Sequence, residues 1–569
     1  MNNSNSIIEI ENASFTYSSR SLPSVTAVNL TIEPGEFVLL TGATGCGKST
    51  LLKMLNGLIP QESGGLFSGR VTVGGRDVSD FSVAEMSSFV GMMFQSPDDQ
   101  IFSTTVGDEV AFILENGGMN LQDIPVRVSG TLALVGLAGM ENRSVHALSG
   151  GQKQRLALAA VLAARPRVLA LDEPISQLDP RGATALLEVV EKLNKTLGIT
   201  VVIVEHRLHE VMPLCHRVVV MDQGKIVWQG TRQESFRQPE IFSDYGLRLP
   251  QTVNICQRLG ISTETAAIAP VVEKIRERYD IVSPNGGSPA CRAAAALTGG
   301  ETETAALQDI VFRYGKAERN VLDHLSLSVF KGQFIALMGN NGAGKSTLLQ
   351  HIAGLLQPLS GRVRVMGKPA GEARQTIGMV MQNPDFMLFN ATVREEVEFA
   401  LRQRCRPAEA GAPCRTLIQA LGLAGMEEDF PLALSRGQRL RVAIAAVLSY
   451  RPAVLLLDEP TTGQDIGHID DIVLLLKRYT AAGGSAVFCT HDAEVAAKYA
   501  DRVVVMTRGR IVADSSPTAV FSRDDILRPA GLKPPAAMLV ARQLYNGTAV
   551  TVEEVVSYVR QNSVGSSAG

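Results

Sequence analysis

The feature that most constrains this chain is an internal duplication, in which long sequence blocks occur twice and in the same order. GATGCGKSTLL at Gly42–Leu52 returns as GNNGAGKSTLL at Gly339–Leu349, and MMFQSPDDQIF returns as MVMQNPDFMLF. The longest block, ALSGGQKQRLALAAVLAARPRVLALDEP at Ala147–Pro174, returns as ALSRGQRLRVAIAAVLSYRPAVLLLDEP. A period this long predicts a duplicated domain and not a solenoid of short repeats.

The 569 residues are too many for one hydrophobic core. The ends of the two halves also match, because GLRLP at Gly246–Pro250 corresponds to GLKPP at Gly531–Pro535. Each half is therefore expected to carry a core and a small C-terminal appendage. A run rich in Gly, Pro, Ala and Ser separates the halves and is typical of a flexible linker. The predicted organisation is domain 1 over 1–282, linker over 283–303 and domain 2 over 304–569.

Short, continuously apolar runs indicate the fold class. Phe37–Leu40 and Phe334–Met338 each lead into a Gly-rich turn, and Val168–Leu171 and Val454–Leu457 each lead into an Asp-Glu pair. Strands that are apolar on both faces suit a parallel sheet covered by helices on both sides. The sequence therefore predicts an α/β fold in each half.

Composition limits the partners and the cellular compartment that this chain is expected to have. Apolar residues make up 45% and charged residues 20% of the chain, and the net charge of −3 carries no footprint for nucleic acid. The seven cysteines form no CxxC pair, and the start of the chain is unlike a signal sequence, which favours a reducing cytoplasm. No stretch approaches the roughly 18 apolar residues of a membrane span. A partner would have to bring this protein to a membrane.

The two Gly-rich loops are candidate phosphate sites. A GxxxxGKS loop curls backbone N–H groups around phosphate oxygens and opens a helix whose N-terminus favours an anion. Lys48 and Lys345 are expected to reach the β- and γ-phosphates, and Ser49 and Ser346 to offer a hydroxyl to Mg²⁺. The remaining loop residues predicted to bind nucleotide are Gly42, Ala43, Thr44, Gly45, Cys46, Gly47 and Thr50, and Gly339, Asn340, Asn341, Gly342, Ala343, Gly344 and Thr347.

The acid pairs are candidates for metal binding and catalysis. Asp172 and Asp458 end apolar strands, where a carboxylate can hold hydrated Mg²⁺. Glu173 and Glu459 follow them, and a Glu at this place can orient and deprotonate the attacking water. An Asp-Glu pair alone is more often a strand end that caps the next turn, but one that follows a phosphate loop at this distance favours catalysis.

LSGGQ at Leu148–Gln152 and LSRGQ at Leu434–Gln438 discriminate among ATPases that share phosphate loops. A Ser-Gly-rich helix start just before the acid-pair strand is characteristic of ATP-binding cassettes, and the chain resembles that family over nearly its whole length. The resemblance implies two tandem cassettes, each with a parallel-sheet core, an antiparallel β subdomain, a helical subdomain and an appendage. It also implies that each signature contacts the ATP bound by the opposite cassette. The simpler interpretation of each signature is a capped helix start without a ligand contact, since Ser149 and Ser435 are natural N-caps.

Other positions match family elements one by one. The resemblance implies that Gln95 and Gln382 contact Mg²⁺ and the attacking water, and that His206 and His491 contact the γ-phosphate. It further implies D-loop aspartates at Asp179 and Asp465, and adenine-stacking aromatics at Tyr17 and Tyr314. A Tyr in an N-terminal strand is more often simply packed.

By the same resemblance, the halves pack antiparallel and enclose two ATP molecules. Site one would join Lys48, Ser49, Gln95, Asp172, Glu173 and His206 to Ser435, Gly437 and Gln438. Site two would join Lys345, Ser346, Gln382, Asp458, Glu459 and His491 to Ser149, Gly151 and Gln152. Both sites keep the lysine, both acids and the histidine, which predicts hydrolysis at both. Arg436 replaces a signature glycine, and Gln177 and Gln464 are unusual residues for D-loops.

Three functions fit such an ATPase: the motor of a membrane importer, a soluble tandem-cassette factor acting on ribosomes, and a DNA-maintenance ATPase. The short linker lacks the charged helices of ribosome factors, and DNA-maintenance relatives need zinc modules or long coiled coils. FQSPDDQIFSTTVGDEVAF at Phe94–Phe112 and EHRLHEVMPLCHRVVVMDQGKIV at Glu205–Val227 resemble energy-coupling factor ATPases. Tandem sugar-importer ATPases are also double cassettes but usually degrade one site.

The energy-coupling resemblance implies a peripheral location on the cytoplasmic face of the cell membrane, ATP and Mg²⁺ as cofactors, and no nucleic acid. The implied partners are a transmembrane coupling subunit and a membrane substrate-binding subunit for a vitamin, a vitamin precursor or a cobalt or nickel ion. Asp98, Asp99 and Asp385 match acidic positions that face coupling helices, and basic coupling helices would suit them. The simpler interpretation is that they cap the turns after Pro97 and Pro384.

Overall fold

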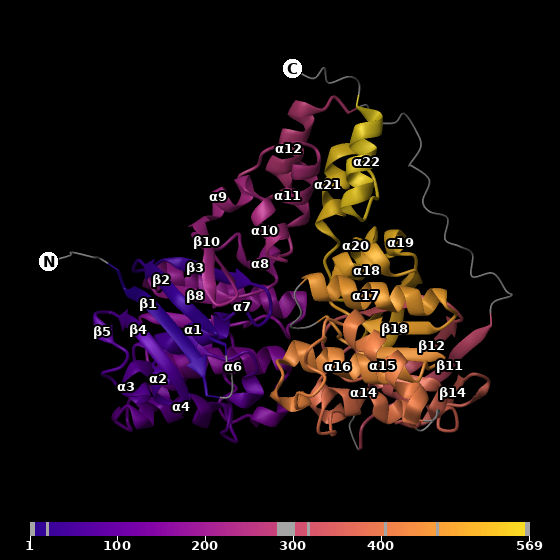
Figure 1. Ribbon diagram of the computed structural model, residues 1–569, viewed down its shortest axis with the longest axis horizontal. Helices are drawn as coiled ribbons and strands as arrows, with labels where there is room; N and C mark the ends of the chain where they lie inside the picture. The colour runs from indigo at the N-terminus through magenta and orange to yellow at the C-terminus, as the bar shows by residue number, and fades with distance from the viewer. Residues whose placement is uncertain are drawn as a thin grey trace. The chain divides into compact units, whose positions relative to one another are not determined.

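The structure, a computed structural model, describes residues 6–18, 22–281, 302–315, 319–402, 407–461 and 466–563. The chain forms two compact units (Figure 1): unit 1 comprises Met1–Val253 and Ser262–Ala266, and unit 2 comprises Asn254–Ile261 and Ala267–Gly569. Residues 282–301, most of the predicted linker, lie outside the described residues, as do Gln464 and Asp465. No described helix has the length and apolarity needed to cross a membrane.

Unit 1 is built on a six-stranded sheet in the order β10-β9-β3-β8-β7-β6. Its central strands pair in parallel and are buried along their length, as the apolar runs predict, while β10 joins β9 antiparallel. The strands are β3 (Phe37–Gly42), β6 (Val90–Met93), β7 (Val168–Asp172), β8 (Thr200–Val204), β9 (Arg217–Asp222) and β10 (Lys225–Thr231). A second, antiparallel sheet has the order β2-β1-β4-β5, from β1 (Ile8–Tyr17), β2 (Val25–Ile32), β4 (Gly65–Val73) and β5 (Arg76–Asp77).

Helices of unit 1 pack on the sheets through two apolar clusters. In one cluster, α4, α5 and α6 pack against one another, and their apolar side chains are buried together with those of β3, β7 and β8; in the other, α1 contacts strands of both sheets. The helical elements are α1 (Lys48–Leu55), α2 (Leu58–Gln61), α3 (Val83–Ser87), η1 (Pro97–Asp99), α4 (Val106–Asn116), α5 (Ile124–Leu134), η2 (Val145–Ala147), α6 (Gly150–Ala163), α7 (Pro180–Leu197), α8 (Leu208–Val211), α9 (Arg232–Arg237) and α10 (Glu240–Asp244).

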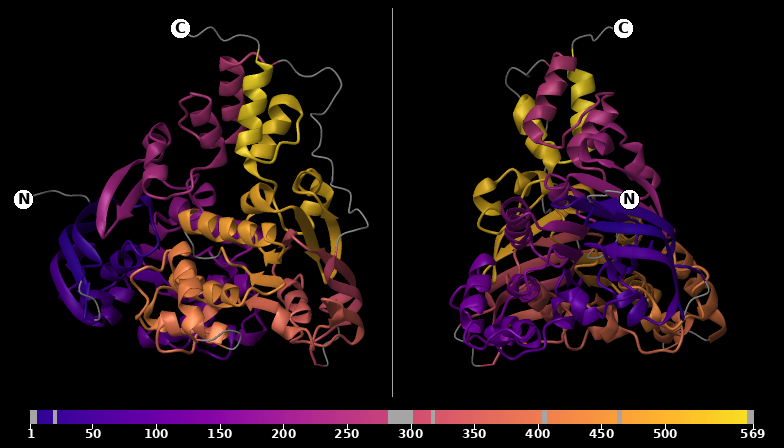
Figure 2. Two further views of the ribbon diagram at one scale, coloured as in Figure 1. Left: turned by 45° about the vertical axis from the view of Figure 1, so that its right-hand side comes forward. Right: turned by 90° about the vertical axis from the view of Figure 1, so that its left-hand side faces the viewer.

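Unit 2 repeats this plan, with a six-stranded sheet in the order β16-β17-β18-β13-β19-β20 and a four-stranded sheet in the order β12-β11-β14-β15. Figure 2 shows the second set of sheets and helices from two further sides. The strands are β11 (Glu303–Phe312), β12 (Leu322–Phe330), β13 (Phe334–Met338), β14 (Ser360–Val365), β15 (Lys368–Pro369), β16 (Ile377–Val380), β17 (Val454–Asp458), β18 (Ser485–Cys489), β19 (Arg502–Thr507) and β20 (Arg510–Ser515).

The helical elements that follow in unit 2 are α13 (Lys345–Ile352), η3 (Arg374–Thr376), η4 (Pro384–Met387), α14 (Val393–Arg402), α15 (Pro407–Ala420), η5 (Pro431–Ala433), α16 (Arg436–Ser449), α17 (Ile466–Ala481), α18 (Ala493–Tyr499), α19 (Pro517–Phe521) and α20 (Asp524–Leu527). These elements follow the order of those in unit 1, except that α2 has no counterpart among the described helices of unit 2. The duplicated α/β fold with two cassette-like cores is therefore confirmed.

The two appendages join in one helical module, formed by α11 (Gln251–Arg258), α12 (Ile268–Arg278), α21 (Ala536–Tyr545) and α22 (Val552–Asn562). Apolar side chains of all four helices share one cluster, including Ile255, Ile275, Ala541 and Val555. The magenta and yellow helices lie side by side in Figures 1 and 2. Thus residues from the end of the first half fold as part of unit 2.

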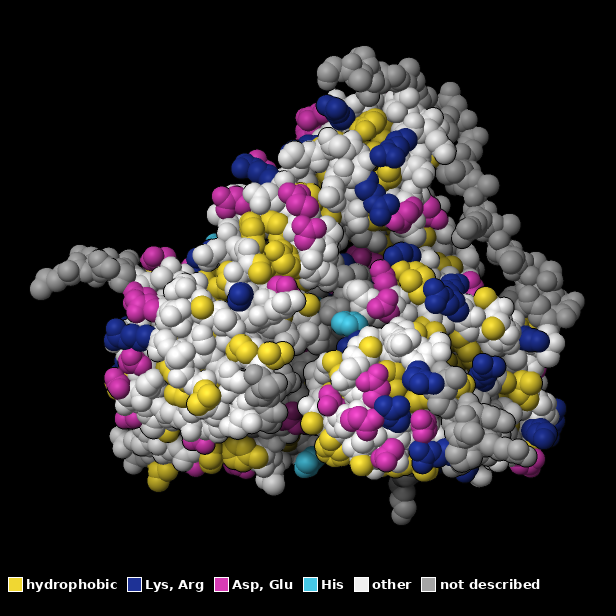
Figure 3. All heavy atoms as spheres, viewed as in Figure 1, with side chains coloured by type: hydrophobic (Ala, Val, Ile, Leu, Met, Phe, Trp, Pro, Cys, Tyr) yellow, Lys and Arg dark blue, Asp and Glu magenta, His cyan; other side chains and the backbone are white. Residues whose placement is uncertain are grey.

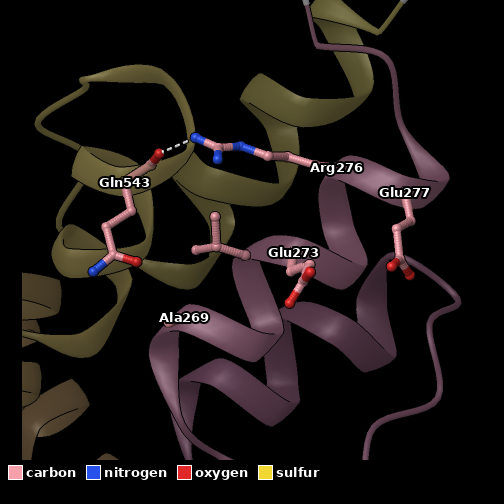
Figure 4. A pocket seen from close by; sticks show the side chains of 6 residues that line it. Ala269, Glu273, Arg276, Glu277 and Gln543 are labelled. Atoms are coloured by element: carbon pink, nitrogen blue, oxygen red, sulfur yellow. Dashed lines mark hydrogen bonds between the residues drawn. The ribbon is translucent and has the colours of Figure 1, made fainter.

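Polar contacts also join the module's helices from the first half to those from the second. Arg276 donates from its guanidinium to the Gln543 carbonyl oxygen, across a hollow of about 630 Å³ between α12 and α21 (Figure 4). Arg258 lies 3.0 Å from the Glu553 carboxylate, and the Arg560 guanidinium donates to the Arg258 carbonyl at 2.6 Å. These contacts fix the register of the helices from the first half on those from the second.

Candidate active sites

The Gly-rich loop of unit 1 leaves the carboxyl end of β3 and enters α1. Gly42 has φ +150°, and a Cβ there would lie 2.1 Å from the Met221 carbonyl oxygen. Gly47 has φ +106°, and its Cβ would lie 2.3 Å from the Ser24 carbonyl oxygen. No side chain fits at either place, so the loop conformation requires glycine. In unit 2, Gly339 stands in the same relation to the Met506 carbonyl, at 2.2 Å.

Each loop lysine is buried and held by the loop itself. Lys48 Nζ donates to the carbonyls of Gly42 at 2.9 Å and Ala43 at 2.8 Å. Lys345 Nζ donates to the carbonyls of Gly339 at 2.7 Å and Asn340 at 3.2 Å. Both ammonium groups therefore lie inside the curl of backbone N–H groups, where an anion such as a phosphate is favoured.

The strand-end aspartates have the properties of magnesium ligands. Asp172 is 7% exposed, its Oδ1 has no hydrogen-bond partner, and Ser49 hydrogen-bonds to the carboxyl group. Asp458 is 6% exposed and is hydrogen-bonded by Ser346. A buried carboxylate oxygen beside a hydroxyl suits Mg²⁺, which prefers oxygen ligands and keeps several waters. Here Mg²⁺ would neutralise phosphate charge, with Ser49, Asp172, Ser346 and Asp458 as its protein ligands.

Glutamine, glutamate and histidine meet at the same edge of each parallel sheet. Gln95, Glu173 and His206 follow the neighbouring strands β6, β7 and β8, and the carboxyl ends of parallel strands share one edge. Gln95 Nε2 donates to Glu173 Oε2 at 2.7 Å, and His206 Nε2 lies 3.2 Å from Glu173 Oε1. These three side chains can hold and polarise one water molecule between them.

The second triad has the same arrangement with different distances. Gln382 Nε2 lies 3.5 Å from Glu459 Oε2, and His491 Nε2 lies 2.7 Å from Glu459 Oε1. Both glutamates have left-handed backbone, with φ of +47° at Glu173 and +54° at Glu459. Such a conformation costs a non-glycine residue on the order of 1 kcal/mol or more and persists where surrounding contacts impose it.

The two N-terminal tyrosines lie over the helices that follow the Gly-rich loops. The Tyr17 hydroxyl is 3.3 Å from Thr50 Oγ1, and the Tyr314 hydroxyl is 3.2 Å from Thr347 Oγ1. Tyr314 is 49% exposed, so its ring is accessible to a ligand. This placement is compatible with stacking on an adenine, which stays a prediction.

Both signatures are capped helix starts. Ser149 accepts from the Gln152 N–H, and the Gln152 side chain accepts from the Ser149 N–H in turn. Ser435 and Gln438 form the same capping box at the start of α16. Capping is therefore confirmed. Their predicted contact with the ATP of the opposite cassette stays a prediction.

The segments that contain Gln95 and Gln382 are called the Q-loops, and an acid that follows each of these glutamines is ion-paired to the signature helix of its own unit. Asp98 lies 2.5 Å from Lys153 of α6, and Asp385 lies 2.9 Å from Arg439 of α16. The partner cations Lys153 and Arg439 therefore offset part of the negative charge that the sequence predicts at Asp98 and Asp385. Asp179 caps α7 by accepting from the Gly182 N–H at 2.7 Å.

Sequence reasoning missed Glu205 and Arg207, the residues on either side of His206. Glu205 is 1% exposed, and burial, followed by the charge of Glu173, raises its pKa to about 8. The signal that could have found it is an acid at the end of a buried, apolar strand.

Asp172→Asn is expected to stabilise the nucleotide-free protein while removing a predicted magnesium ligand. Burial, then the charge of Glu173, raises the pKa of Asp172 to about 6. Folding therefore favours the protonated acid, and this advantage is lost as the pH rises through about 6. Asparagine stays neutral, so its gain is about 3 kcal/mol at pH 8 and about half of that at pH 5. Thermal unfolding at the two pH values measures the gain.

The control for this prediction is Asp244→Asn, which alters an exposed carboxylate in α10 and should change stability little at either pH. A gain from Asp172→Asn that is equal at pH 5 and pH 8 would contradict the expected ionisation of the buried acid.

Comparisons with known proteins show which family and which relatives this chain resembles. A family model described as ABC transporter matches residues 25–176 and 322–462. An ABC transporter ATP-binding protein of Methanosarcina mazei is 41% identical over 554 residues, or 95% of this chain and 94% of the relative. Another from Caldanaerobacter subterraneus is 34% identical, over 94% of this chain and 96% of the relative. A solved structure of cbiO1 from Clostridium perfringens, part of the complex cbiONQ, is 32% identical over 44% of this chain and 99% of that one, with a TM-score of 0.39.

Proposed function

The chain belongs to the ABC transporter ATPases, and on that premise we propose that it is the motor of a membrane importer of the energy-coupling factor type. Members of this family hydrolyse ATP to ADP and phosphate, and this chain is an ATPase with two cassettes. The cargo would be a vitamin, a vitamin precursor or a transition-metal ion. The motor would act from the cytoplasmic face of the membrane.

The observation that carries the proposal is a pair of exposed aromatic contacts at equivalent places in the two units. Phe102 and Phe112 meet edge to face at 4.5 Å between ring centroids, and Phe389 and Phe399 meet at 5.0 Å. Phe102 and Phe389, which follow the Q-loops, are 62% and 67% exposed. Large apolar side chains grouped in the open are typical of an interaction surface. Helices of a transmembrane subunit are the proposed occupants.

Charge around these aromatics supports a protein partner. The ion pairs Asp98–Lys153 and Asp385–Arg439 place both signs beside the Q-loops, as in the polar rim of an interface. Over α14 and α15, acidic and basic side chains are interspersed on the face seen in Figure 3. A nucleic-acid partner would instead be met by a surface of one positive sign.

The proposed cycle uses two composite ATP sites. One would pair Lys48, Asp172, Glu173 and His206 with Ser435, Gly437 and Gln438. The other would pair Lys345, Asp458, Glu459 and His491 with Ser149, Gly151 and Gln152. ATP that contacts both cassettes favours the closed state, and hydrolysis removes that preference. The coupling helices of the membrane subunit would follow this change.

Co-purification tests the proposal. A tagged chain, expressed in its own cells and solubilised in mild detergent, is expected to retain a transmembrane subunit and a second, substrate-binding membrane protein. The double variant Phe102→Ser and Phe389→Ser should reduce this capture by about tenfold, because it removes the central apolar anchors. ATP binding should stay unchanged.

Leu66→Ser with Leu359→Ser is the matched control, because these leucines are 80% and 62% exposed and lie in β4 and just before β14. It should leave capture unchanged. Recovery of ribosomes or DNA without a membrane subunit would overturn the importer function. Recovery of a sugar-transport membrane complex would overturn the energy-coupling assignment alone.

A further inference from the structure

The segments around the two catalytic-site histidines differ between the units. In unit 1, β8 runs into Glu205, His206 and Arg207, whereas in unit 2, β18 runs into Thr490, His491 and Asp492. Glu205 and Thr490 are both 1% exposed, so a carboxyl group and a hydroxyl occupy equivalent buried places. The histidines themselves contact Glu173 and Glu459 in the same manner.

Glu205 links two backbone segments of unit 1. Its Oε1 accepts from the Ile175 N–H at 2.9 Å, and its Oε2 accepts from the His206 N–H at 3.2 Å. Ile175 begins the D-loop, defined here as Ile175–Asp179, which follows Glu173 and Pro174. A carboxyl group whose two oxygens are bonded to two segments fixes their separation, and burial strengthens such bonds.

Arg207 holds the same loop from the other side of His206. One guanidinium nitrogen, Nη1, donates to the carbonyls of Ile175 at 3.0 Å and Leu178 at 2.8 Å, and the other pairs with Glu210. A planar guanidinium with fixed donors is well suited to bridge two carbonyls. We call Glu205 and Arg207 the D-loop clamp.

The D-loop in turn holds Glu173. Ser176 donates to the Glu173 carbonyl from its N–H at 3.2 Å and from its hydroxyl at 3.0 Å. Glu173 has left-handed backbone, a conformation that needs support from its neighbours. The contacts therefore run from the clamp through the D-loop to the backbone of Glu173, and through Glu205 to the backbone of His206.

In unit 2, Thr490 and Asp492 form hydrogen bonds within their own turn, and residues 462–465, which correspond to most of the D-loop, lie outside the described residues. Thr490 Oγ1 accepts from the Asp492 N–H at 3.0 Å. Asp492 Oδ1 accepts from the N–H groups of Glu494 and Val495, which caps α18. An ionised aspartate has no donor with which to bridge two carbonyls as Arg207 does.

We propose that Glu205 and Arg207 are positioning residues that align Glu173 with His206 through the D-loop, so that hydrolysis in unit 1 depends on a clamp whose two residues are replaced by Thr490 and Asp492 in unit 2. The two ATP sites would then be matched in catalytic residues but differ in the residues on either side of the histidine. The proposal deepens the ATPase function and rests on the proposed role of Glu173 in activating water.

Kinetics of the full-length chain test the clamp. Arg207→Ala and Glu205→Ala should each lower kcat by up to about twofold, because one of the two sites loses its alignment, while KM changes less than kcat. Arg207→Lys should recover part of the loss, since an ammonium can still donate to these carbonyls. In a Glu173→Gln background the same substitutions should have no further effect, because they act through Glu173.

Arg232→Ala is the matched control, because Arg232 also donates from Nη1 to two backbone carbonyls, those of Met212 and Pro213, but away from Glu173. It should leave kcat unchanged. Unchanged kcat in both clamp variants, an equal loss in Arg232→Ala, or a further loss in the Glu173→Gln background would overturn the clamp. Full activity of Glu173→Gln alone would instead overturn the role of Glu173 itself.

Discussion

Replacing Glu173 and Glu459 together by glutamine is expected to lower ATP turnover by about 10²–10⁴-fold while ATP still binds. Each glutamate lies between a glutamine amide and a histidine ring, in a position to accept a proton from water. Glutamine keeps the shape of the side chain but is no base. Steady-state hydrolysis and equilibrium binding of a fluorescent ATP analogue, measured on the same preparation, separate the two effects.

The single variants decide how many sites hydrolyse ATP. If both do so equally, as the matched residues predict, Glu173→Gln and Glu459→Gln should each remove about half of the turnover. Full turnover in one single variant and none in the other would show that one site carries the activity alone. That result would contradict the expectation of two working sites.

Lys48→Ala and Lys345→Ala should weaken ATP binding, each at its own site, by about 10–100-fold. Each lysine is held by two loop carbonyls in the curl of the Gly-rich loop, so its charge is in place before the phosphates arrive. A charge-assisted hydrogen bond contributes roughly 1.5–3 kcal/mol, which corresponds to this change in affinity. Titration with the fluorescent analogue should show one tight site remaining in each variant.

Lys192→Ala is the control, because it removes an equal charge from the exposed face of α7. It should leave both affinities unchanged. Two tight sites in the Lys48→Ala protein would show that this lysine does not contribute to nucleotide binding. Glutamate variants thus affect turnover and lysine variants affect affinity, so the two kinds of site residue are distinguished by measurement.

Much of this arrangement could be predicted because it depends on local sequence. Gly42 and Gly47 occupy positions where no side chain fits. Asp172 ends a strand whose other residues are all apolar. Each pattern therefore admits few structures, and its repetition makes chance coincidence negligible. The order of Gln95, Glu173 and His206 after neighbouring strands follows from a parallel sheet once the fold class is known.

The remainder depends on contacts between distant segments. A buried acid such as Glu205 gives no sign in the sequence of which N–H groups it meets, and Ile175 is thirty residues away. The acids expected to meet a basic partner lie beside Lys153 and Arg439 of their own units, a pairing set by helix packing. The apolar faces of α12 and α21 indicate burial but do not identify the partner helix.

The shared helical module has a consequence for assembly. Because α12 from the first half packs with α21 and α22 from the second, the halves are joined by a folded interface in addition to the peptide link. Two binding partners tethered in this way experience each other at a high effective concentration, on the order of millimolar for short links. If the proposed composite sites form, loss of ATP would open them without dispersing the two halves. Each new cycle would then begin as an intramolecular encounter, independent of how much protein the cell contains.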